Sequence, residues 1–410
     1  MVLVVHPFGN ANVRGVLAAV DGANRLAKYL TTLGWSKNSP FLQALRESVR
    51  AEMLRRGYDL PHYKIKIHPA REIVRLLAEK AGFRWLTQHE IGWASIDRVW
   101  SSLDKVAAEY LRSNHERLKI DRVYAYEDCA VRSFEVAQQL GLARIYDLPI
   151  AYWETARRLL RHEAERYPQW EPTLGGTRDS DEKLARKTRE LELADTVICP
   201  SAFVLDSLPD QVRASKKCVV APFGSPVCEP DKDAPDLPKQ RRLRLLFAGA
   251  LTQRKGLADL FAAMKMVDAA NIELVVMGSL VLPMKFYRNE FPEFTYEPPR
   301  AHPEVLRLMR SCDVFVLPSI VEGRALVQQE AMACGLPLLV TRNAGGEDLI
   351  IEGKTGFLAP PGEPAALAEK IKWFLENREQ LPAMKDAARA KAAELTWHAY
   401  GQQILHAIGE

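Results

Sequence analysis

Short, continuously apolar runs alternate with longer amphipathic stretches over most of this chain, and that alternation constrains its fold more than any other feature. Such runs are typical of parallel strands whose two faces are both covered by helices. The alternation therefore predicts a doubly wound α/β architecture. Strands are predicted at Val2–His6, Val123–Tyr126, Arg144–Tyr146, Thr196–Cys199, Cys218–Ala221, Leu243–Ala248, Ile272–Met277, Asp313–Leu317 and Leu336–Val340.

A chain of 410 residues is too long for one ordinary hydrophobic core, so two domains are expected. The segment from Ser225 to Arg242 holds four prolines and many charges but no hydrophobic period, as linkers do. We therefore predict a first domain at residues 1–225, a linker at 226–242, a second domain at 243–394 and a C-terminal segment at 395–410. Each domain opens with a strand and a glycine turn, which favours two Rossmann-like domains.

The composition is that of a globular enzyme, with 47% hydrophobic and 26% charged residues. A formal charge of +4 argues against a dedicated nucleic-acid binder, so no nucleic-acid partner is expected. The six cysteines show no metal-ligand spacing, and buried reduced thiols are expected. No secretory signal and no apolar run of about 18 residues is found, so a cytoplasmic location is expected.

Two carboxylates, Glu322 and Glu330, are separated by seven residues between two predicted strands. A strand, a short loop with Glu322 and a helix with Glu330 would place both acids at one crevice, along the carboxyl edge of a sheet. The N-terminus of that helix would point free backbone N–H groups at the same crevice, which makes an anion site. An anion flanked by two hydroxyl-binding carboxylates describes a nucleotide sugar.

The sequence around these acids, together with the block LRLLFAGALTQRKGL at Leu243–Leu257, resembles the retaining GT-B glycosyltransferases of family 4, the glycosyl transferases group 1. The resemblance is dense from Leu243 onward and scattered in the first half. It implies the GT-B fold, in which two Rossmann-like domains with parallel sheets face each other. It also implies that residues 395–410 form a helix that crosses back to the first domain.

The resemblance further implies an enzyme that moves a sugar from a nucleotide-diphosphate sugar to an acceptor hydroxyl with retained configuration. Metal independence and a front-face mechanism are expected, with no cofactor besides the donor. Fixed cations would stabilise the charge that builds on the leaving diphosphate. The acceptor would be a glycan, a glycolipid or a small molecule.

Individual roles follow from the same resemblance. Lys255, Arg254 and Glu322 are the predicted catalytic residues, and Glu322 would contact hydroxyls of the transferred sugar. Glu330 would hold the ribose. The remaining predicted donor-site residues are Gly249, Tyr296, Arg324, Ala325 and Leu326. The chain departs from the family pattern at Ala250, where an arginine is common, at Arg324–Ala325, and at Tyr146, where a histidine is expected.

In the first domain, Gly9 and Asn10 form a glycine turn that would close over the diphosphate or the acceptor. Asp147 and Glu127 follow predicted strands and would face the cleft, where they could serve the acceptor. Glu127 could equally cap the helix that follows it.

The segment from Phe41 to Leu86 has ten basic and five acidic residues, an excess of +5. One interpretation is an acceptor-binding or membrane-surface patch with Phe83 and Trp85 as anchors, which would allow peripheral membrane contact. Solvated helix faces with core aromatics are the other interpretation, and charge runs favour it. The oligomeric state stays open.

Three alternative functions share some of these features. A GT-B epimerase or a polymerising glycan synthase would share the donor site. An NAD-dependent oxidoreductase with two Rossmann halves needs a GxGxxG turn with a downstream acid, and neither glycine turn completes that pattern. A two-domain binding protein of the periplasmic type would need an export signal.

Overall fold

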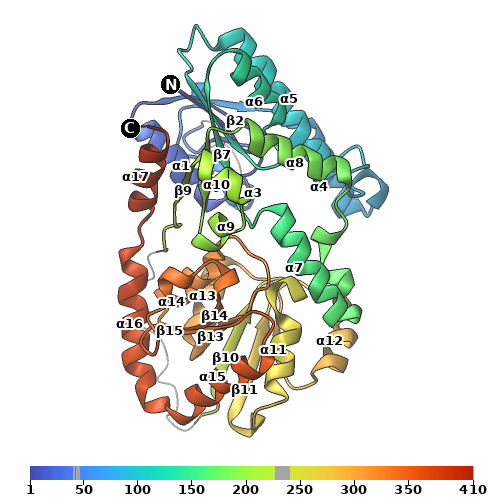
Figure 1. Ribbon diagram of the computed structural model, residues 1–410, viewed down its shortest axis with the longest axis vertical. Coiled ribbons are helices and arrows are strands. Elements are labelled where there is room, and N and C mark those ends of the chain that lie inside the picture. Colours follow the sequence, from blue (N-terminus) through green and yellow to red (C-terminus); the bar gives the residue numbers. More distant parts are fainter. Residues whose placement is uncertain (40–41, 43–46, 227–240, 410) are drawn as a thin grey trace.

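The computed structural model describes residues 1–39, 42, 47–226 and 241–409. Two parallel sheets form two domains, one above the other in Figure 1. Most of the predicted linker, residues 226–242, lies outside the described residues. The two-domain α/β architecture agrees with the prediction.

The first sheet has seven strands in the order β5-β2-β1-β6-β7-β8-β9, and every neighbouring pair is parallel. Its strands are β1 (Val2–Val5), β2 (Leu26–Thr31), β5 (Ile65–Ile67), β6 (Arg122–Tyr126), β7 (Ala143–Asp147), β8 (Thr196–Cys199) and β9 (Lys217–Val220). The helices of this half are α1 (Ala11–Gly22), α3 (Glu47–Leu54), α4 (Ala70–Ala81), α5 (Ile96–Asn114), α6 (Val131–Gln139), α7 (Trp153–Arg166), α8 (Asp181–Leu193), α9 (Ala202–Asp206) and α10 (Asp210–Ser215). A separate two-stranded sheet joins β3 (Trp35–Ser36) to β4 (Gly57–Tyr58).

The second sheet has six parallel strands in the order β12-β11-β10-β13-β14-β15. These are β10 (Leu243–Ala248), β11 (Ile272–Met277), β12 (Thr295–Glu297), β13 (Val314–Leu317), β14 (Leu338–Thr341) and β15 (Gly356–Ala359). The helices are α11 (Leu257–Met264), α12 (Met284–Glu290), α13 (His302–Arg310), α14 (Leu326–Ala333), α15 (Pro364–Glu376), α16 (Leu381–Glu394) and α17 (Trp397–Ala407).

Both faces of the first sheet are buried, as the continuously apolar strands predict. Along β1, Val2 and Val4 belong to one hydrophobic cluster, while Leu3 and Val5 belong to another on the opposite face. All four side chains are fully buried. The alternation of side-chain direction along a strand explains this division.

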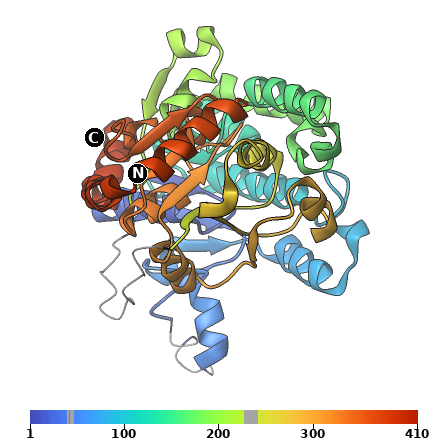
Figure 2. The same ribbon diagram turned by 90° about the horizontal axis from the view of Figure 1, so that it is seen from below.

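Helix α17 returns to the first domain and packs on α1, which confirms the predicted crossing (Figure 1). Close approach of the two helices depends on small residues. A Cβ on Gly15 would lie 2.8 Å from the Tyr400 ring, and one on Gly401 would lie 2.9 Å from Ala19. Thr396 caps the N-terminus of α17, where its Oγ1 accepts from the Ala399 amide at 3.0 Å. Seen from below, the C-terminal helices lie on the flank opposite the light-blue segment that holds α4 (Figure 2).

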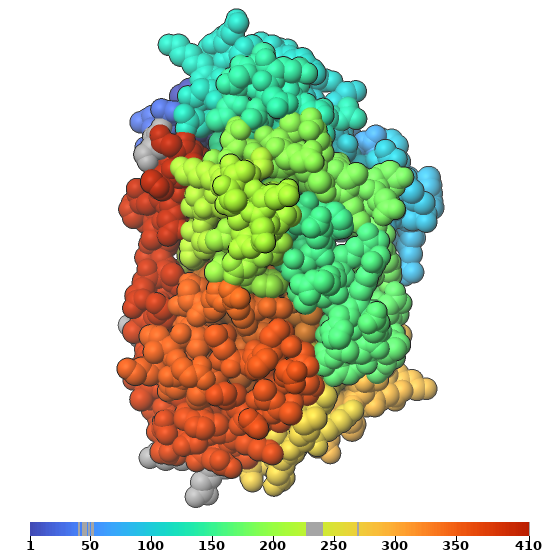
Figure 3. Space-filling model, viewed as in Figure 1, coloured from blue at the N-terminus to red at the C-terminus, as the bar shows by residue number. Residues whose placement is uncertain are grey.

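One segment of the first half packs on the second domain. We call it the α7–η3 arm, and it consists of α7 and the 3-10 helix η3 (Pro168–Thr173). Trp170 of this arm is fully buried in the core of the second domain, with its ring 5.0 to 6.1 Å from the rings of Phe286, Tyr287 and Phe261. In the space-filling view the green arm lies against the yellow and orange surface of the second domain (Figure 3).

Among the described residues, no helix combines the length and the apolar character that a membrane span requires.

Candidate active site

The loop after β10 carries the predicted cations, and a glycine fixes its position. Arg254 and Lys255 lie in the short 3-10 helix η5 (Gln253–Lys255), which ends at Gly256 with φ +76°. A Cβ on Gly256 would lie 1.9 Å from the carbonyl oxygen of Pro318, so only glycine fits there. The Arg254 carbonyl accepts from the Ile320 amide at 2.9 Å. The loop is therefore pinned against the chain that follows β13.

This arrangement brings the three predicted catalytic residues together. One oxygen of Glu322, Oε2, lies 3.2 Å from Nη1 of Arg254 and forms an ion pair with Nζ of Lys255. Burial alone would raise the pKa of Glu322, but the charges of Arg254 and Lys255 outweigh it and hold that pKa below its ordinary value. Burial lowers the pKa of Lys255, and Glu322 opposes this shift. The site is a partly buried triad of one carboxylate and two cations.

Glu330 lies on α14, one turn beyond its start, and its carboxylate is largely but not fully buried. Its Oε1 lies 3.0 Å from Nε2 of His302, at the start of α13. The next two residues, Ala331 and Met332, are fully buried, as the sequence predicts for a packed helix. No sequence pattern singles out His302 as the partner of Glu330.

The side chain of Arg324 binds other groups of the protein itself. Its guanidinium holds the carboxylate of Asp348 with two bonds of 2.6 and 2.9 Å, and it also donates to Gln329 and to the Gly345 carbonyl. Its side chain is fully buried. The amide of Ala325 donates to the Ala344 carbonyl at 3.3 Å. These two predicted donor-site residues are thus engaged in holding their own loop to the segment at 344–348.

The same loop touches the first domain. A Cβ on Gly323 would lie 1.7 Å from the carbonyl oxygen of Pro149. That Gly323 carbonyl accepts from Ser201 Oγ at 2.7 Å, and Gln329 donates to the Phe223 carbonyl at 2.6 Å. Leu326 packs against the hydrophobic cluster of the first domain. The Glu322 loop therefore lies at the domain interface.

The other predicted nucleotide-site residues lie at the same edge of the second sheet. Gly249 follows β10, and its amide donates to the Met277 carbonyl at 2.9 Å. A Cβ on Gly278, after β11, would lie 1.8 Å from the Gly249 oxygen, so the two turns are in contact. Tyr296 of β12 donates its hydroxyl to the Gly278 carbonyl at 3.0 Å. Because the strands are parallel, their carboxyl ends share the edge that holds Glu322.

Gln253 is a functional candidate that sequence reasoning missed. It is fully buried, and its amide nitrogen donates to Glu163 at 2.6 Å and to Asp259 at 2.8 Å. Its backbone N–H donates to Thr173 Oγ1 at 3.1 Å. Glu163 and Thr173 both belong to the α7–η3 arm, so the arm holds the residue directly before Arg254. No local pattern could reveal a partner that lies 90 residues away.

The glycine turn of the first domain lies next to Tyr58. A Cβ on Gly9 would lie 2.6 Å from the Tyr58 hydroxyl, and the Gly9 carbonyl accepts from Arg14 Nε at 3.0 Å. Asn10 is exposed at the N-cap of α1, with no side-chain capping bond. The packing of Gly9 explains the glycine without a ligand.

Asp147 and Glu127 are buried, whereas the sequence predicted that they face the cleft. Asp147 ends β7, and burial raises its pKa to about 7. Its Oδ2 has no hydrogen-bond partner among the described residues. Glu127 forms an ion pair with Lys187 of α8 at 3.0 Å, and burial raises its pKa. Neither carboxylate is presented to an acceptor in this structure.

Glu127 is also not the cap of α6. Glu190 accepts from the amides of Asp128 and Ala130 at 2.8 and 3.0 Å, and Asp104 accepts from the amides of Arg132 and Ser133 at 2.7 and 2.9 Å. Two acids from α8 and α5 therefore satisfy the N-terminus of α6.

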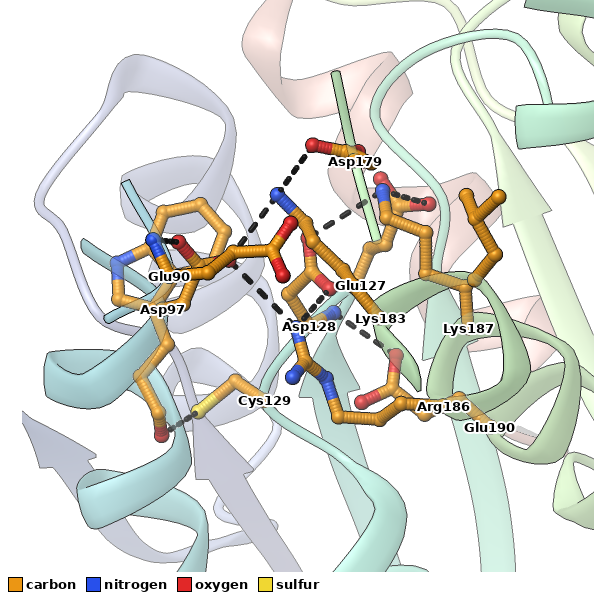
Figure 4. A network of polar contacts seen from close by, with 12 residues as sticks. Glu90, Asp97, Glu127, Asp128, Cys129, Asp179, Lys183, Arg186, Lys187 and Glu190 are labelled. Atoms are coloured by element: carbon orange, nitrogen blue, oxygen red, sulfur yellow. Dashed lines mark hydrogen bonds and ion pairs between the residues drawn. The ribbon is translucent and has the colours of Figure 1, made fainter. Parts of the chain in front are cut away.

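Figure 4 shows the buried polar network that surrounds this end of α6. Asp128, with an unusual φ of +66°, pairs with Arg186 at 2.8 Å and with Lys187 at 3.2 Å. Tyr146, which stands where the family has a histidine, donates to Glu190 at 3.2 Å. Burial raises the pKa of Glu190. The network supports the fold of the first domain, and it explains Tyr146 without a sugar contact.

Only one cluster in the described part of the chain has the spacing of a metal site, namely His89, Glu90 and Asp179. His89 Nε2 lies 3.1 Å from both acids, and Lys183 pairs with Asp179 at 3.0 Å. Lys183 therefore already compensates the charge of Asp179. Metal independence of the reaction stays a prediction.

Two facing α/β domains with parallel sheets, tied together by a returning C-terminal helix, define the GT-B fold. Sucrose-phosphate synthase from Thermosynechococcus elongatus aligns over 99% of this chain and 97% of its own, with a TM-score of 0.66 and 19% identity. HepE of Anabaena, in complex with UDP and glucose, aligns over 99% and 98%, with a TM-score of 0.62 and 17% identity. These likenesses show the fold alone.

Residues 229–391 match the family described as Glycosyl transferases group 1. An uncharacterized glycosyltransferase of Methanocaldococcus jannaschii is 30% identical over 154 residues, which cover 37% of this chain and 44% of the relative. The chain thus spans less than half the length of the curated relatives it matches first. The second half of the chain carries a glycosyl transferases group 1 domain, and the predicted enzyme class agrees with it.

Proposed function

We propose that this protein transfers a sugar from a nucleotide-diphosphate sugar to an acceptor hydroxyl, with retained configuration and without a metal ion. The observation that carries the proposal is the ion-paired triad of Glu322, Arg254 and Lys255 at the domain interface. Its setting in a glycosyl transferases group 1 domain supports the reaction class. HepE of Anabaena, which shares the fold, forms a complex with UDP and glucose, and this supports a nucleotide sugar as donor here.

The triad suggests how the donor is bound. Arg254 and Lys255 are two fixed cations. Such cations stabilise the negative charge that develops on a diphosphate as its sugar leaves. A diphosphate bound by Arg254 and Lys255 would compensate the two positive charges that Glu322 compensates in this structure. The Glu322 oxygens would then accept hydrogen bonds from the hydroxyls of the sugar.

Retention by front-face attack follows from the same chemistry. The acceptor hydroxyl would approach on the face that the diphosphate leaves, and the diphosphate would take its proton. Glu322 is suited to binding rather than to nucleophilic attack because two cations stabilise its charge. Glu330, hydrogen-bonded to His302, would accept from the ribose hydroxyls. The first domain would supply the acceptor site, and the reaction would take place in the cytoplasm.

Thermal shift with UDP-, GDP- and ADP-sugars, each with and without a chelator, tests the proposal. We expect one nucleotide to raise the unfolding temperature equally in both conditions. Absence of stabilisation by all three would contradict the donor site, and loss of stabilisation on chelation would contradict metal independence. Product analysis with the stabilising donor then distinguishes transfer from epimerisation, which leaves a nucleotide sugar as its product.

A further inference from the structure

The exposed apolar residues of this protein are concentrated in one segment. Thirteen large hydrophobic side chains are exposed among the described residues, and nine of them lie between Tyr63 and Ile96. We call these nine the apolar face: Tyr63, Ile67, Ile73, Leu77, Phe83, Trp85, Ile91, Trp93 and Ile96. The most exposed are Tyr63 at 70%, Trp85 at 69% and Ile91 at 66%. Scattered single exposures are ordinary, whereas exposed apolar side chains that gather on one part of a surface are typical of interaction sites.

Backbone and ring contacts hold the part of the apolar face between Ile73 and Trp93 together. Ile73 and Leu77 lie one turn apart on α4, so they project from the same side of that helix. Helix α4 ends at Gly82 with φ +76°, and the 3-10 helix η2 (Arg84–Leu86) follows at once. The Arg71 guanidinium lies 4.5 Å from the centre of the Trp93 ring, and the Ala94 amide donates to the Leu86 carbonyl at 2.8 Å. The turn that carries Trp93 is therefore folded back on α4 and η2.

Acids of this segment are already paired with cations of the protein itself. Glu72 is fully buried and pairs with Arg75 at 2.8 Å and with Arg56 at 3.4 Å. Glu79 pairs with Arg75 at 2.7 Å, and Asp97 pairs with Lys183 at 3.0 Å. Their negative charge is thus compensated locally.

Three exposed cations in the same segment have no acidic partner in the described parts of the chain. These are Lys80, Arg84 and Arg98. Lys80 and Arg84 lie in sequence between residues of the apolar face, and Arg98 follows Ile96 by two residues. The surface thus presents aromatic and aliphatic side chains together with uncompensated positive charge.

We propose that the apolar face docks on a membrane surface that contains anionic lipids. Tryptophan, tyrosine and phenylalanine beside lysine and arginine are the side chains that favour the boundary between headgroups and acyl chains. Anionic headgroups complement the uncompensated cations of this segment. A protein partner would need acids facing Lys80, Arg84 and Arg98, and a second copy of the same face offers cations instead. The inference does not depend on the transferase activity.

Vesicle flotation of the full-length protein tests the proposal. We expect it to float with vesicles of phosphatidylcholine mixed with phosphatidylglycerol, and to stay at the bottom with phosphatidylcholine alone or when salt is raised. Leu77→Ser with Trp85→Ser should weaken binding by about tenfold or more, because two apolar side chains that would enter the membrane interface are lost. Lys80→Gln with Arg84→Gln should weaken it by a similar factor and reduce its dependence on salt.

The matched control is Met266→Ser with Val281→Ser, which changes two exposed apolar residues of the second domain and should leave flotation unchanged. Unfolding temperatures should stay close to wild type for all variants, since the substituted side chains are exposed. The proposal is overturned if the wild type does not float with the mixed vesicles, or if the control variant loses binding as well. It is also overturned if sedimentation shows a dimer that Leu77→Ser with Trp85→Ser dissociates while flotation is unaffected.

Discussion

The carboxamide of Gln253 donates to the carboxylate of Glu163 at 2.6 Å, and this bond joins the loop of the predicted cations to a helix 90 residues earlier in the chain. Both side chains are buried, and Arg166 and Asp259 complete the cluster with an ion pair of 2.9 Å. The geometry of Arg254 and Lys255 is thus set partly by the first half of the sequence.

Gln253→Ala should loosen that loop. The change leaves Glu163 and the Asp259 carboxylate without one donor each, which should lower the free energy of unfolding by about 1–3 kcal/mol. Donor binding should weaken further than stability alone explains, because the adjacent cations lose their support. Denaturant unfolding and nucleotide titration measure the two effects. Gln380→Ala, at an exposed glutamine, is the control, and equal donor affinity in Gln253→Ala and wild type would refute the positioning role.

Lys255→Ala should abolish most of the transfer rate. Removal of one fixed cation beside the leaving diphosphate should reduce kcat by about 100-fold or more. It should also raise the pKa of Glu322, since one of the two cations that hold it down is gone. Lys370→Ala serves as the control, because Lys370 is paired with Glu352 on the surface. A Lys255→Ala enzyme with the wild-type rate would remove Lys255 from the site.

Glu330→Gln should affect ribose recognition specifically. A carboxylate that accepts ribose hydroxyls should make the wild type prefer a ribose nucleotide over its 2′-deoxy or 3′-deoxy analogue by about tenfold. The glutamine variant should show a smaller preference. Competition binding with matched nucleotides measures it. Glu304→Gln, an exposed acid on α13, should keep the full preference, and an unchanged preference in Glu330→Gln would contradict the ribose role.

Asp147→Asn should change the dependence of stability on pH. The folded pKa of about 7 lies above the unfolded value of 3.8, so the folded state holds the proton more tightly. Stability from this group is therefore present below about pH 4 and is lost as pH rises toward 7, by up to about 1.4 kcal/mol per pH unit. The asparagine variant should lack this loss and be more stable than wild type at pH 8. Unfolding series across pH for both proteins, with exposed Asp386→Asn as control, test it; parallel profiles would disprove the shift.

Gly256→Ala should lower the free energy of unfolding much more than Gly353→Ala, although both glycines have nearly the same positive φ. Gly353 has φ +73° with open space around it, so Gly353→Ala should cost only the conformational penalty of about 1 kcal/mol. Gly256 has nearly the same φ, but an added Cβ would meet the Pro318 carbonyl at 1.9 Å. We expect a larger loss of stability and of nucleotide binding from Gly256→Ala alone. Equal effects of the two changes would contradict the tight contact.

Much of the fold could be predicted because buried parallel strands are continuously apolar. The bounds of β8, β10 and β11 agree with the predicted ones to the residue. Strand β2 was missed because Lys28 interrupts its apolar run, and in the structure that lysine reaches the Tyr63 carbonyl. The short edge strands β5 and β12 carry too few residues to show a pattern.

The meeting of Glu322 with Arg254 and Lys255 was predictable for a topological reason. The residues follow β10 and β13, which pair directly, so their carboxyl ends are neighbours. Side-chain partners were not predictable in this way. Arg324 contacts Asp348, and Glu127 contacts Lys187. Both outcomes depend on loops and helices that approach from elsewhere in the chain.

Because Trp170 completes the core of the second domain, the two halves of this chain cannot be separated at the linker without loss of packing. A truncated product that starts at Leu243 would carry the complete second sheet, yet it would have a tryptophan-sized hole among Phe261, Phe286 and Tyr287. A chimaera that exchanges the second half at the linker would place Trp170 against a core from another protein. An exchange that keeps this core intact must carry the α7–η3 arm, residues 153–173, together with the second domain, although the arm precedes that domain in the chain.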